Sequence, residues 1–467
     1  MLTKDINILL IVGYDLNKGM IFGIIIQISK ENNMKINARK LALRILDEIE
    51  GTNDFSHMVL SNTFKKYDID SGDRRFISHL CLGVLENKLL LDYYIRKLSA
   101  QRFSRIHHSV VNILRIGLYQ LTYMSKIPDS AAVDECVKLA KNISVKDASF
   151  VNGILRNYIR MDKKIELPNR KQHLVTHLSI KHSFPEWLVQ LWLDEYGVAF
   201  TEALLAASNR TPNLSIRVND LLTSRASYLE LLESKGVKAF ASELTSLGII
   251  IEDLNHLGIQ DLPGFEDGFF TIQDISSMKV ADMADIKPGM TVVDVCAAPG
   301  GKTTHVAQLM KQTGKVIARD VHEQKLSLIR ENVERLKLKN VQVELFDAMV
   351  RDEALIDQAD VVLVDAPCSG LGIIRRKPDI KYNKTLEQLN SLVEIQKQIL
   401  STASQYVKKN GVLIYSTCTL NKSENQEVVM WFLEQNTEFE LDETPFVTLF
   451  PNTNQTDGFF IAKLIKK

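Results

Sequence analysis

Two short apolar runs, each ending abruptly in small and turn-forming residues, constrain the fold most. Residues 361–364 run into Asp365-Ala366-Pro367-Cys368-Ser369-Gly370, and residues 412–415 run into Ser416-Thr417-Cys418-Thr419. Runs rich in β-branched residues without polar alternation are typical of strands buried on both faces of a parallel sheet. Ligands of open α/β sheets bind just beyond the carboxyl ends of such strands. The pattern therefore predicts that Cys368 and Cys418 meet at one crevice.

An alternation of strand and helix patterns predicts a doubly wound α/β domain over residues 286–467. A strand pattern at 291–295 is followed by a helical pattern to Met310, and strand patterns at 315–318 and 341–345 end near Asp320 and Asp347. Small residues after the first strand allow the backbone to approach a ligand at a helix start. This loop consists of Cys296, Ala297, Ala298, Pro299, Gly300, Gly301 and Lys302.

Three kinds of nucleotide site compete for this loop. A Walker A loop matches at Gly301-Lys302-Thr303 but has Cys296 in place of its leading glycine, and no G-x-G-x-x-G triplet is present. An S-adenosylmethionine site needs a small-residue loop after the first strand, an acid after the second and a polar residue after the third. The loop, Asp320 and Asp347 provide all three elements.

Residues 34–165 are predicted to form an all-α domain. Val110, Leu114, Leu118 and Leu121 recur at helical spacing, and strand patterns are absent from this segment. Basic residues of this domain allow two interpretations, a patch that faces RNA or a solvated helix surface. They are Arg39, Lys40, Arg44, Arg74, Arg75, Arg102 and Arg105.

Residues 166–285 are predicted to form a linker and a small α+β subdomain. Strand patterns at 214–218, 248–251 and 269–272 accompany a helical pattern at 227–235. Arg217 and Asn219 lie at the end of the strand pattern at 214–218. They are candidates for a contact with a phosphate group, and the alternative is an ordinary pair of surface residues.

Composition excludes several classes of protein. The chain is 45% apolar and 24% charged with net charge zero, which excludes a disordered chain and neither demands nor excludes RNA. Five scattered cysteines offer no metal site and favour a reducing cytoplasm. The apolar runs before residue 30 are too short to span a membrane. We expect Met34 to be the native start and residues 1–33 to be an upstream extension.

Residues 34–165 resemble the helical RNA-binding domain of the NusB antitermination factor. The motifs are Asn37-Ala38-Arg39-Lys40-Leu41-Ala42, Phe55-Ser56, Asp73-Arg74-Arg75-Phe76, Pro128, Ala131-Ala132-Val133, Glu135 and Phe150-Val151-Asn152-Gly153-Ile154-Leu155-Arg156. The resemblance implies an RNA-binding helical module.

The loop at 296–303 and the two cysteine motifs together resemble the RNA 5-methylcytosine methyltransferases of the NOL1/NOP2/Sun family. With a NusB-like domain in front, the chain resembles the RsmB (Sun, Fmu) branch, which methylates a cytosine in small-subunit (16S) ribosomal RNA. The resemblance implies S-adenosylmethionine as cofactor, ribosomal RNA as partner and no metal. It also implies a Rossmann-like methyltransferase domain preceded by the NusB-like domain and an α+β RNA-recognition subdomain.

The resemblance also implies roles for individual residues. Cys418 would be the nucleophile that adds to cytosine C6, Cys368 would assist product release, and Asp365 would hydrogen-bond the cytosine edge. The residues that would bind the cofactor or line its pocket are Cys296, Ala297, Ala298, Pro299, Gly300, Gly301, Lys302, Asp320, Asp347 and Asp365.

Some alternatives stay open at this stage. Pro367-Cys368 resembles the nucleophile motif of DNA cytosine methyltransferases, so the division of roles between the two cysteines depends on the family resemblance. Arg375 and Arg376 are either a solvated charge run or phosphate contacts. A non-catalytic RNA-binding factor of ribosome assembly is the alternative function. We expect a monomer.

Overall fold

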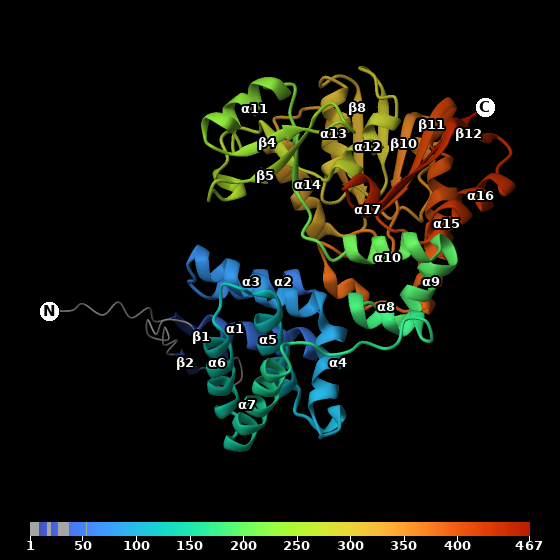
Figure 1. The fold of residues 1–467 in the computed structure, drawn as a ribbon. Coiled ribbons are helices and arrows are strands. Elements are labelled where there is room, and N and C mark those ends of the chain that lie inside the picture. The colour runs from blue at the N-terminus through green and yellow to red at the C-terminus, as the bar shows by residue number, and fades with distance from the viewer. Residues whose placement is uncertain (1–8, 16–19, 27–36, 53) are drawn as a thin grey trace.

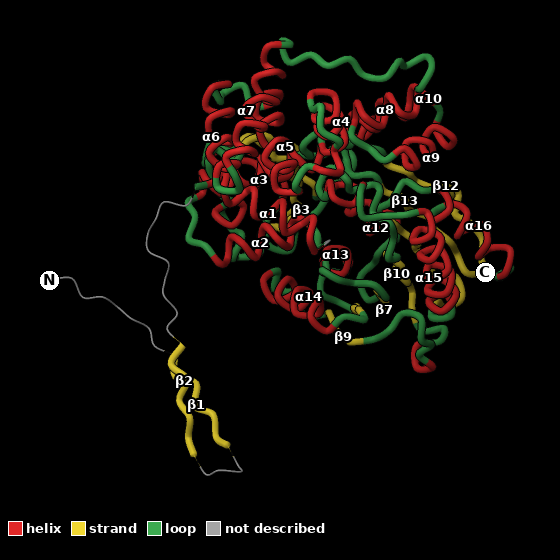
Figure 2. The backbone as a smooth tube through the Cα atoms, turned by 90° about the horizontal axis from the view of Figure 1, so that it is seen from below, coloured by secondary structure: helices red, strands yellow, loops and turns green. Residues whose placement is uncertain are grey.

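The computed structural model describes residues 9–15, 20–26, 37–52 and 54–467. Strands β1 (Leu9–Asp15) and β2 (Met20–Ile26) pair antiparallel with each other, and Figure 2 shows this hairpin apart from the main body. The proposed start at Met34 lies outside the described residues. In the described part of the chain, no helix is long and apolar enough to cross a bilayer.

The N-terminal domain is helical, as predicted. Its central helix α5 is buried almost continuously from Val110 to Leu121, and the other helices pack around it. Cys81 and Cys136 lie in this apolar core. The helices are α1 (Ala38–Thr52), α2 (Ser56–Lys66), α3 (Ser71–Glu86), α4 (Lys88–Leu98), α5 (His108–Tyr123), α6 (Asp129–Lys141) and α7 (Val145–Arg160).

Three short helices connect the helical domain to the C-terminal sheet: α8 (Leu174–His182), α9 (Glu186–Tyr196) and α10 (Val198–Ala207). Figure 1 shows them between the two large domains. Their apolar side chains form one cluster with Leu371 and Leu420. Because these two leucines directly follow the two cysteine motifs, the connecting helices support the loops that carry the cysteines.

A small α+β unit follows, as predicted from the strand patterns. Its sheet has the order β4-β5-β3-β6 and carries α11 (Arg225–Ser234). The strands are β3 (Leu214–Val218), β4 (Lys238–Ala241), β5 (Gly248–Asp253) and β6 (Phe270–Ile272). Strand β4 was not predicted, because its four residues are half exposed and show no apolar run.

The prediction that Arg217 and Asn219 of this unit contact a phosphate group is wrong. Arg217 and Asn219 are each 1% exposed. Arg217 donates hydrogen bonds to the Gly301 carbonyl (2.8 Å) and to Thr304 Oγ1 (3.0 Å) of the following domain. Asn219 donates to the carbonyls of Gly268 and Leu336. Both side chains therefore fasten the small sheet to the C-terminal domain instead of facing a ligand.

The C-terminal domain is a seven-stranded mixed sheet with the order β12-β13-β11-β10-β7-β8-β9. Strands β7 to β11 are parallel, as expected for a doubly wound fold, whereas β13 runs antiparallel to β11 and β12. The strands are β7 (Thr291–Asp294), β8 (Lys315–Asp320), β9 (Val341–Leu345), β10 (Ala359–Asp365), β11 (Val407–Thr417), β12 (Phe439–Leu449) and β13 (Phe459–Lys466).

Helices cover both faces of this sheet. Helices α15 and α16 contribute to one apolar cluster with the sheet, and α12 and α13 contribute to another. The helices are α12 (Ile275–Met283), α13 (Gly301–Leu309), α14 (Glu323–Arg335), α15 (Leu386–Ser404), α16 (Gln426–Gln435) and α17 (Pro451–Asn454). The carboxyl ends of β7, β8, β10 and β11 therefore open onto one edge of the sheet.

Candidate active site

The two cysteine motifs meet at that edge, as predicted. Strands β10 and β11 are parallel neighbours with Asp365 opposite Ser416, so the segments that follow them leave the sheet side by side. The sulfur atoms of Cys368 and Cys418 are 3.4 Å apart. The thiol–thiol hydrogen bond and burial raise the pKa of Cys368 well above its usual value. Two thiols at this distance ionise together only at high cost, so one remains a proton donor to the other.

Asp365 connects the cysteine motifs to the small-residue loop. Its Oδ2 lies 2.6 Å from Lys302 Nζ, and its Oδ1 accepts a hydrogen bond from Ser416 Oγ at 2.8 Å. The Asp365 side chain is 28% exposed, so it remains accessible from the crevice. Lys302 also lies 5.1 Å from the centre of the Phe459 ring. The structure thus places a carboxylate and an ammonium group at the sheet edge from which the two cysteine motifs leave.

The small-residue loop starts helix α13, as its sequence predicts. Gly300 has φ +100°, a conformation that side chains rarely adopt, and α13 begins at Gly301. The Ala298 N–H donates to Asp320 Oδ2 at 3.3 Å, which joins the loop to the end of β8. The loop therefore has a fixed shape beside the cysteines.

Four carboxylates converge on this loop. Burial raises the pKa of Cys296 well above its usual value, and Asp294, Asp365, Asp320 and Asp347 each raise it further by their charge. The predicted cofactor residues from four strand ends are therefore neighbours. Cys296 packs partly against the apolar core of the sheet.

Asp294, one of these four carboxylates, orients the start of helix α13. It is 1% exposed, and its Oδ2 accepts a hydrogen bond from Thr303 Oγ1 at 2.6 Å. Burial raises the pKa of Asp294 to about 6. Because Thr303 lies in the first turn of α13, this contact sets the angle at which the helix leaves the sheet.

A buried polar network beneath the cysteine loops was missed by the sequence analysis. The Glu424 carboxylate is fully buried and accepts hydrogen bonds from the Ser369 N–H (2.8 Å), Ser369 Oγ (2.5 Å), Gln396 Nε2 (3.0 Å) and Asn421 Nδ2 (3.0 Å). Ser369 Oγ also lies 2.7 Å from Thr419 Oγ1. Because Ser369 follows Cys368 and Thr419 follows Cys418, the network fixes the two thiols relative to each other.

One sequence signal could have indicated this network. Residues 421–425 read Asn-Lys-Ser-Glu-Asn, a polar run directly after an apolar strand and the Cys418 motif. Polar runs in loops are usually solvated, and only the tertiary structure shows that Asn421, Glu424 and Asn425 are buried.

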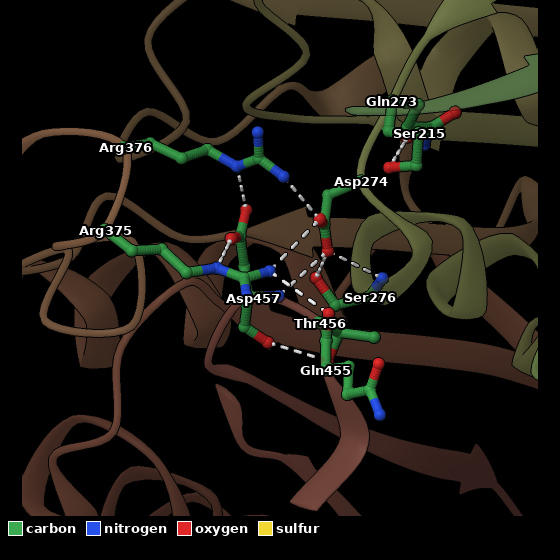
Figure 3. A network of polar contacts seen from close by, with 9 residues as sticks. All are labelled: Ser215, Gln273, Asp274, Ser276, Arg375, Arg376, Gln455, Thr456 and Asp457. Carbon is green, nitrogen blue, oxygen red and sulfur yellow. Dashed lines mark hydrogen bonds and ion pairs between the residues drawn. The ribbon is translucent and has the colours of Figure 1, made fainter. Parts of the chain in front are cut away.

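The arginine pair after the Asp365 motif is held by two acids, and Figure 3 shows the arrangement. Arg375 Nε lies 2.7 Å from Asp457 Oδ1, and Arg376 bridges Asp457 and Asp274 at 2.5 and 2.7 Å. The Arg375 side chain is only 7% exposed. Both interpretations from the sequence, a solvated run and phosphate contacts, are therefore wrong for Arg375. The pair instead ties the segment after the Asp365 motif to the start of α12.

Comparisons with known proteins agree with this architecture. Family models match three segments: "16S rRNA methyltransferase RsmB/F" at residues 282–465, "NusB family" at 36–160 and "Methyltr_RsmF/B-like, ferredoxin-like domain" at 184–256. The "Probable ribosomal RNA small subunit methyltransferase B" of Bacillus subtilis is 37% identical, covering 93% of this chain and 99% of the relative.

Solved structures show the same fold. A protein described as PH0851 has a TM-score of 0.77 and 26% identity, covering 93% of this chain and all of the other. A methyltransferase homolog protein from Pyrococcus horikoshii has a TM-score of 0.57 and 28% identity, covering 63% of this chain and 99% of the other. Together with the sequence relatives, these likenesses show that the chain belongs to the RsmB branch of the 16S rRNA methyltransferases.

Proposed function

We propose that this chain transfers a methyl group from S-adenosylmethionine to C5 of one cytosine in 16S rRNA through a covalent bond between Cys418 and cytosine C6. The observation that supports this most is the pair of thiols 3.4 Å apart beside Asp365, at the carboxyl ends of adjacent parallel strands. Cysteines so placed are rarely needed for packing, whereas a thiol that adds and then leaves needs an open crevice.

The residues at the strand ends fit S-adenosylmethionine. Gly300 and Gly301 present backbone at the start of α13, and Asp320 at the end of β8 suits a ribose diol. Asp347 follows β9, and Lys302 and Asp365 contact each other at the same sheet edge. When bound, the cofactor supplies an electrophilic methyl group on a sulfonium.

The thiols make this methyl transfer possible at a carbon that is otherwise a poor nucleophile. The Cys418 thiolate forms a bond to C6, and the displaced electron pair makes C5 an enamine carbon able to attack the methyl group. Addition places negative charge on the pyrimidine. Asp365 would accept a hydrogen bond from the cytosine amino group, and the Lys302 ammonium, 2.6 Å from Asp365 Oδ2, would offset the developing charge. Lys302 fixes the orientation of that carboxylate.

The second thiol then serves release of the product. After methyl transfer, the C5 proton is removed and the C6–sulfur bond breaks, so that the Cys418 thiolate leaves and the aromatic ring is restored. The sulfur of Cys368 lies 3.4 Å from that of Cys418, and its raised pKa keeps it protonated, so Cys368 would donate its proton to the departing Cys418 sulfur. The Cys368 thiolate left behind would take up the C5 proton, so that both thiols end the cycle as they began it. The target cytosine must leave any base stack to reach these sulfurs, so unstacked RNA is the expected substrate form.

Loss of the gene tests this function directly. Bisulfite sequencing of small-subunit rRNA from cells with and without the gene should show one cytosine that loses its methyl mark. Re-expression of the wild-type protein should restore the mark, and Cys418→Ala should not. Unchanged marks at every cytosine would overturn the proposed reaction and favour a non-catalytic factor of ribosome assembly.

A further inference from the structure

We propose that the cations around the α4–α5 connection form a binding site for the phosphate backbone of RNA. The α4–α5 surface consists of Arg96, Lys97, Arg102 and Arg105. The inference rests on the proposed function in one respect, namely that RNA is the substrate. Beyond that function, it identifies the part of the helical domain that contacts the RNA.

The charge of this surface is not balanced by acids. Residues 93–128 contain no Asp or Glu, although the chain as a whole has as many acids as bases. All four cations of the α4–α5 surface are exposed, and none forms an ion pair with any residue that the structure describes. His107 and His108 extend the acid-free surface at the start of α5. A concentration of unpaired cations is the electrostatic footprint of nucleic-acid binding.

Three other arginines of the helical domain are held by neighbouring groups of the protein. Arg39 donates to Gln120 Oε1 at 2.7 Å and lies over the Phe76 ring. Arg74 donates to the Ile69 carbonyl at 2.9 Å. Arg115 is buried between Asp92 and Glu50. Lys40, Arg44 and Arg75 are exposed as well, so the α4–α5 surface is distinguished by the absence of acids from residues 93–128 and by its hollow.

The surface is also hollowed and braced. A cavity of about 570 Å³ is lined by Arg96 and residues 99–104. The Arg96 guanidinium lies 4.4 Å from the centre of the Phe103 ring, which restrains the side chain, and its N–H groups have no hydrogen-bond partner among the described residues. Gln101 Nε2 donates to the Arg105 carbonyl at 2.9 Å and shapes the loop. A pre-shaped set of guanidinium donors suits phosphate oxygens.

The position of this site implies a long RNA contact. Helix α4 begins at the junction with the C-terminal domain, where the Leu89 N–H donates to Ser183 Oγ and Lys88 lies over the Tyr382 ring. Its eleven residues carry the chain roughly 16 Å away from that junction before the α4–α5 surface is reached. Figure 1 shows α4 leading away from the C-terminal sheet. RNA bound here would extend well beyond the methylated base.

The test compares two triple variants of the full chain. Arg96→Gln/Arg102→Gln/Arg105→Gln removes three cations of the α4–α5 surface. Lys311→Gln/Lys315→Gln/Lys409→Gln removes three exposed cations near the amino ends of the strands, at the edge opposite the cysteines. Binding of each protein to transcribed small-subunit rRNA is measured at several salt concentrations, and thermal melting checks that each variant is folded.

The α4–α5 variant should bind about tenfold or more weakly, and its slope of log affinity against log salt should fall by about 2 to 3, close to one per lost phosphate contact. The control variant should bind as the wild type does. Equal affinity of the α4–α5 variant and wild type, or equal losses in both variants, would overturn the site. Because this binding assay needs no methyl transfer, a wild-type protein that binds rRNA but leaves cytosine unmethylated would overturn only the proposed reaction.

Discussion

Cations that follow the Asp365 motif and cations at the end of α4 have opposite surroundings. Arg375 and Arg376 follow the Asp365 motif, yet both are bound to Asp274 and Asp457. The α4–α5 surface lies far along the chain from that motif, and its cations have no ion pair among the described residues. Nearby carboxylates, and not distance along the chain from the Asp365 motif, thus decide which of these cations are free of ion pairs among the described residues.

The two regions also differ in what their charged groups do. The C-terminal crevice uses its charged groups to fix one another and the thiols, because chemistry needs a single geometry. The helical domain buries one charged cluster, around Arg115, whereas the cations of the α4–α5 surface are exposed. Contacts with phosphate groups depend on charge more than on exact placement of the side chain. Chemistry and RNA affinity should therefore be separable by mutation.

Cys418→Ala should have the largest effect. Without the nucleophile, methyl transfer to small-subunit rRNA should fall by about 10⁴-fold or more. RNA affinity and S-adenosylmethionine affinity should stay unchanged, because the α4–α5 surface and the small-residue loop are intact. Transfer of a radioactive methyl group and equilibrium binding measure the three quantities.

Cys368→Ala is the matched control for the Cys418 variant. Addition to C6 should still occur, and slowed release should accumulate a covalent protein–RNA adduct that migrates slowly in a denaturing gel. If Cys368→Ala abolishes addition and Cys418→Ala forms the adduct, the roles of the two cysteines are exchanged.

Arg217→Ala should weaken the contact between the small sheet and the C-terminal domain. The substitution removes the buried guanidinium that donates to Gln308 Oε1, Thr304 Oγ1 and the Gly301 carbonyl, so we expect a loss of about 3 kcal/mol in the free energy of unfolding. Urea denaturation of the full chain measures it. Arg210→Ala, at an exposed arginine after α10, should change stability by less than about 0.5 kcal/mol. Equal stability of both variants would contradict a structural role for Arg217.

Glu424→Gln should slow the reaction without changing RNA affinity. The glutamine amide places N–H groups where the carboxylate accepted hydrogen bonds from Ser369 and Gln396, so the two cysteine loops should shift apart. A displacement of this kind should lower kcat by about 100-fold while the KM for RNA changes little. Glu427→Gln, at an exposed glutamate on α16, is the control. A normal kcat in the Glu424 variant would show that the network is only structural.

The smallest effect concerns acid stability of the helical domain. Although burial opposes it, Arg115 and Lys88 lower the pKa of Glu50 to about 2. Because the folded pKa lies below the unfolded value, Glu50 stabilises the domain above about pH 4.5, and this contribution is lost as the pH falls toward 2. With a discount for partial exposure, it amounts to about 2 kcal/mol.

Glu50→Gln should remove this acid-dependent contribution. Unfolding free energies at pH 6 and pH 3 should differ less in this variant than in the wild type. Glu48→Gln, an exposed neighbour without an ion pair in the described part of the chain, should retain the wild-type difference. Identical pH dependence in all three proteins would contradict the role of the Glu50 cluster.

The sequence by itself determined the fold class of each domain and their order along the chain. It also determined which residues meet at the crevice. Apolar runs that break into turn residues are local signals, so Cys368, Cys418, Asp365 and the loop from Cys296 to Lys302 could be placed at strand ends before the structure was known. The carboxyl ends of parallel strands lie at the same edge of a sheet, so residues that follow those strands come together there.

Only the tertiary structure decided which polar groups are free. Arg376 meets Asp274 across 102 positions of the chain, Arg375 meets Asp457 across 82, and Arg217 meets Gly301 across 84. Glu424 is separated from Ser369 by 55 positions and is buried although it lies in a polar run. The free energy of a charged group depends on the charges and donors within a few ångströms of it, and those neighbours come from segments that only folding brings together.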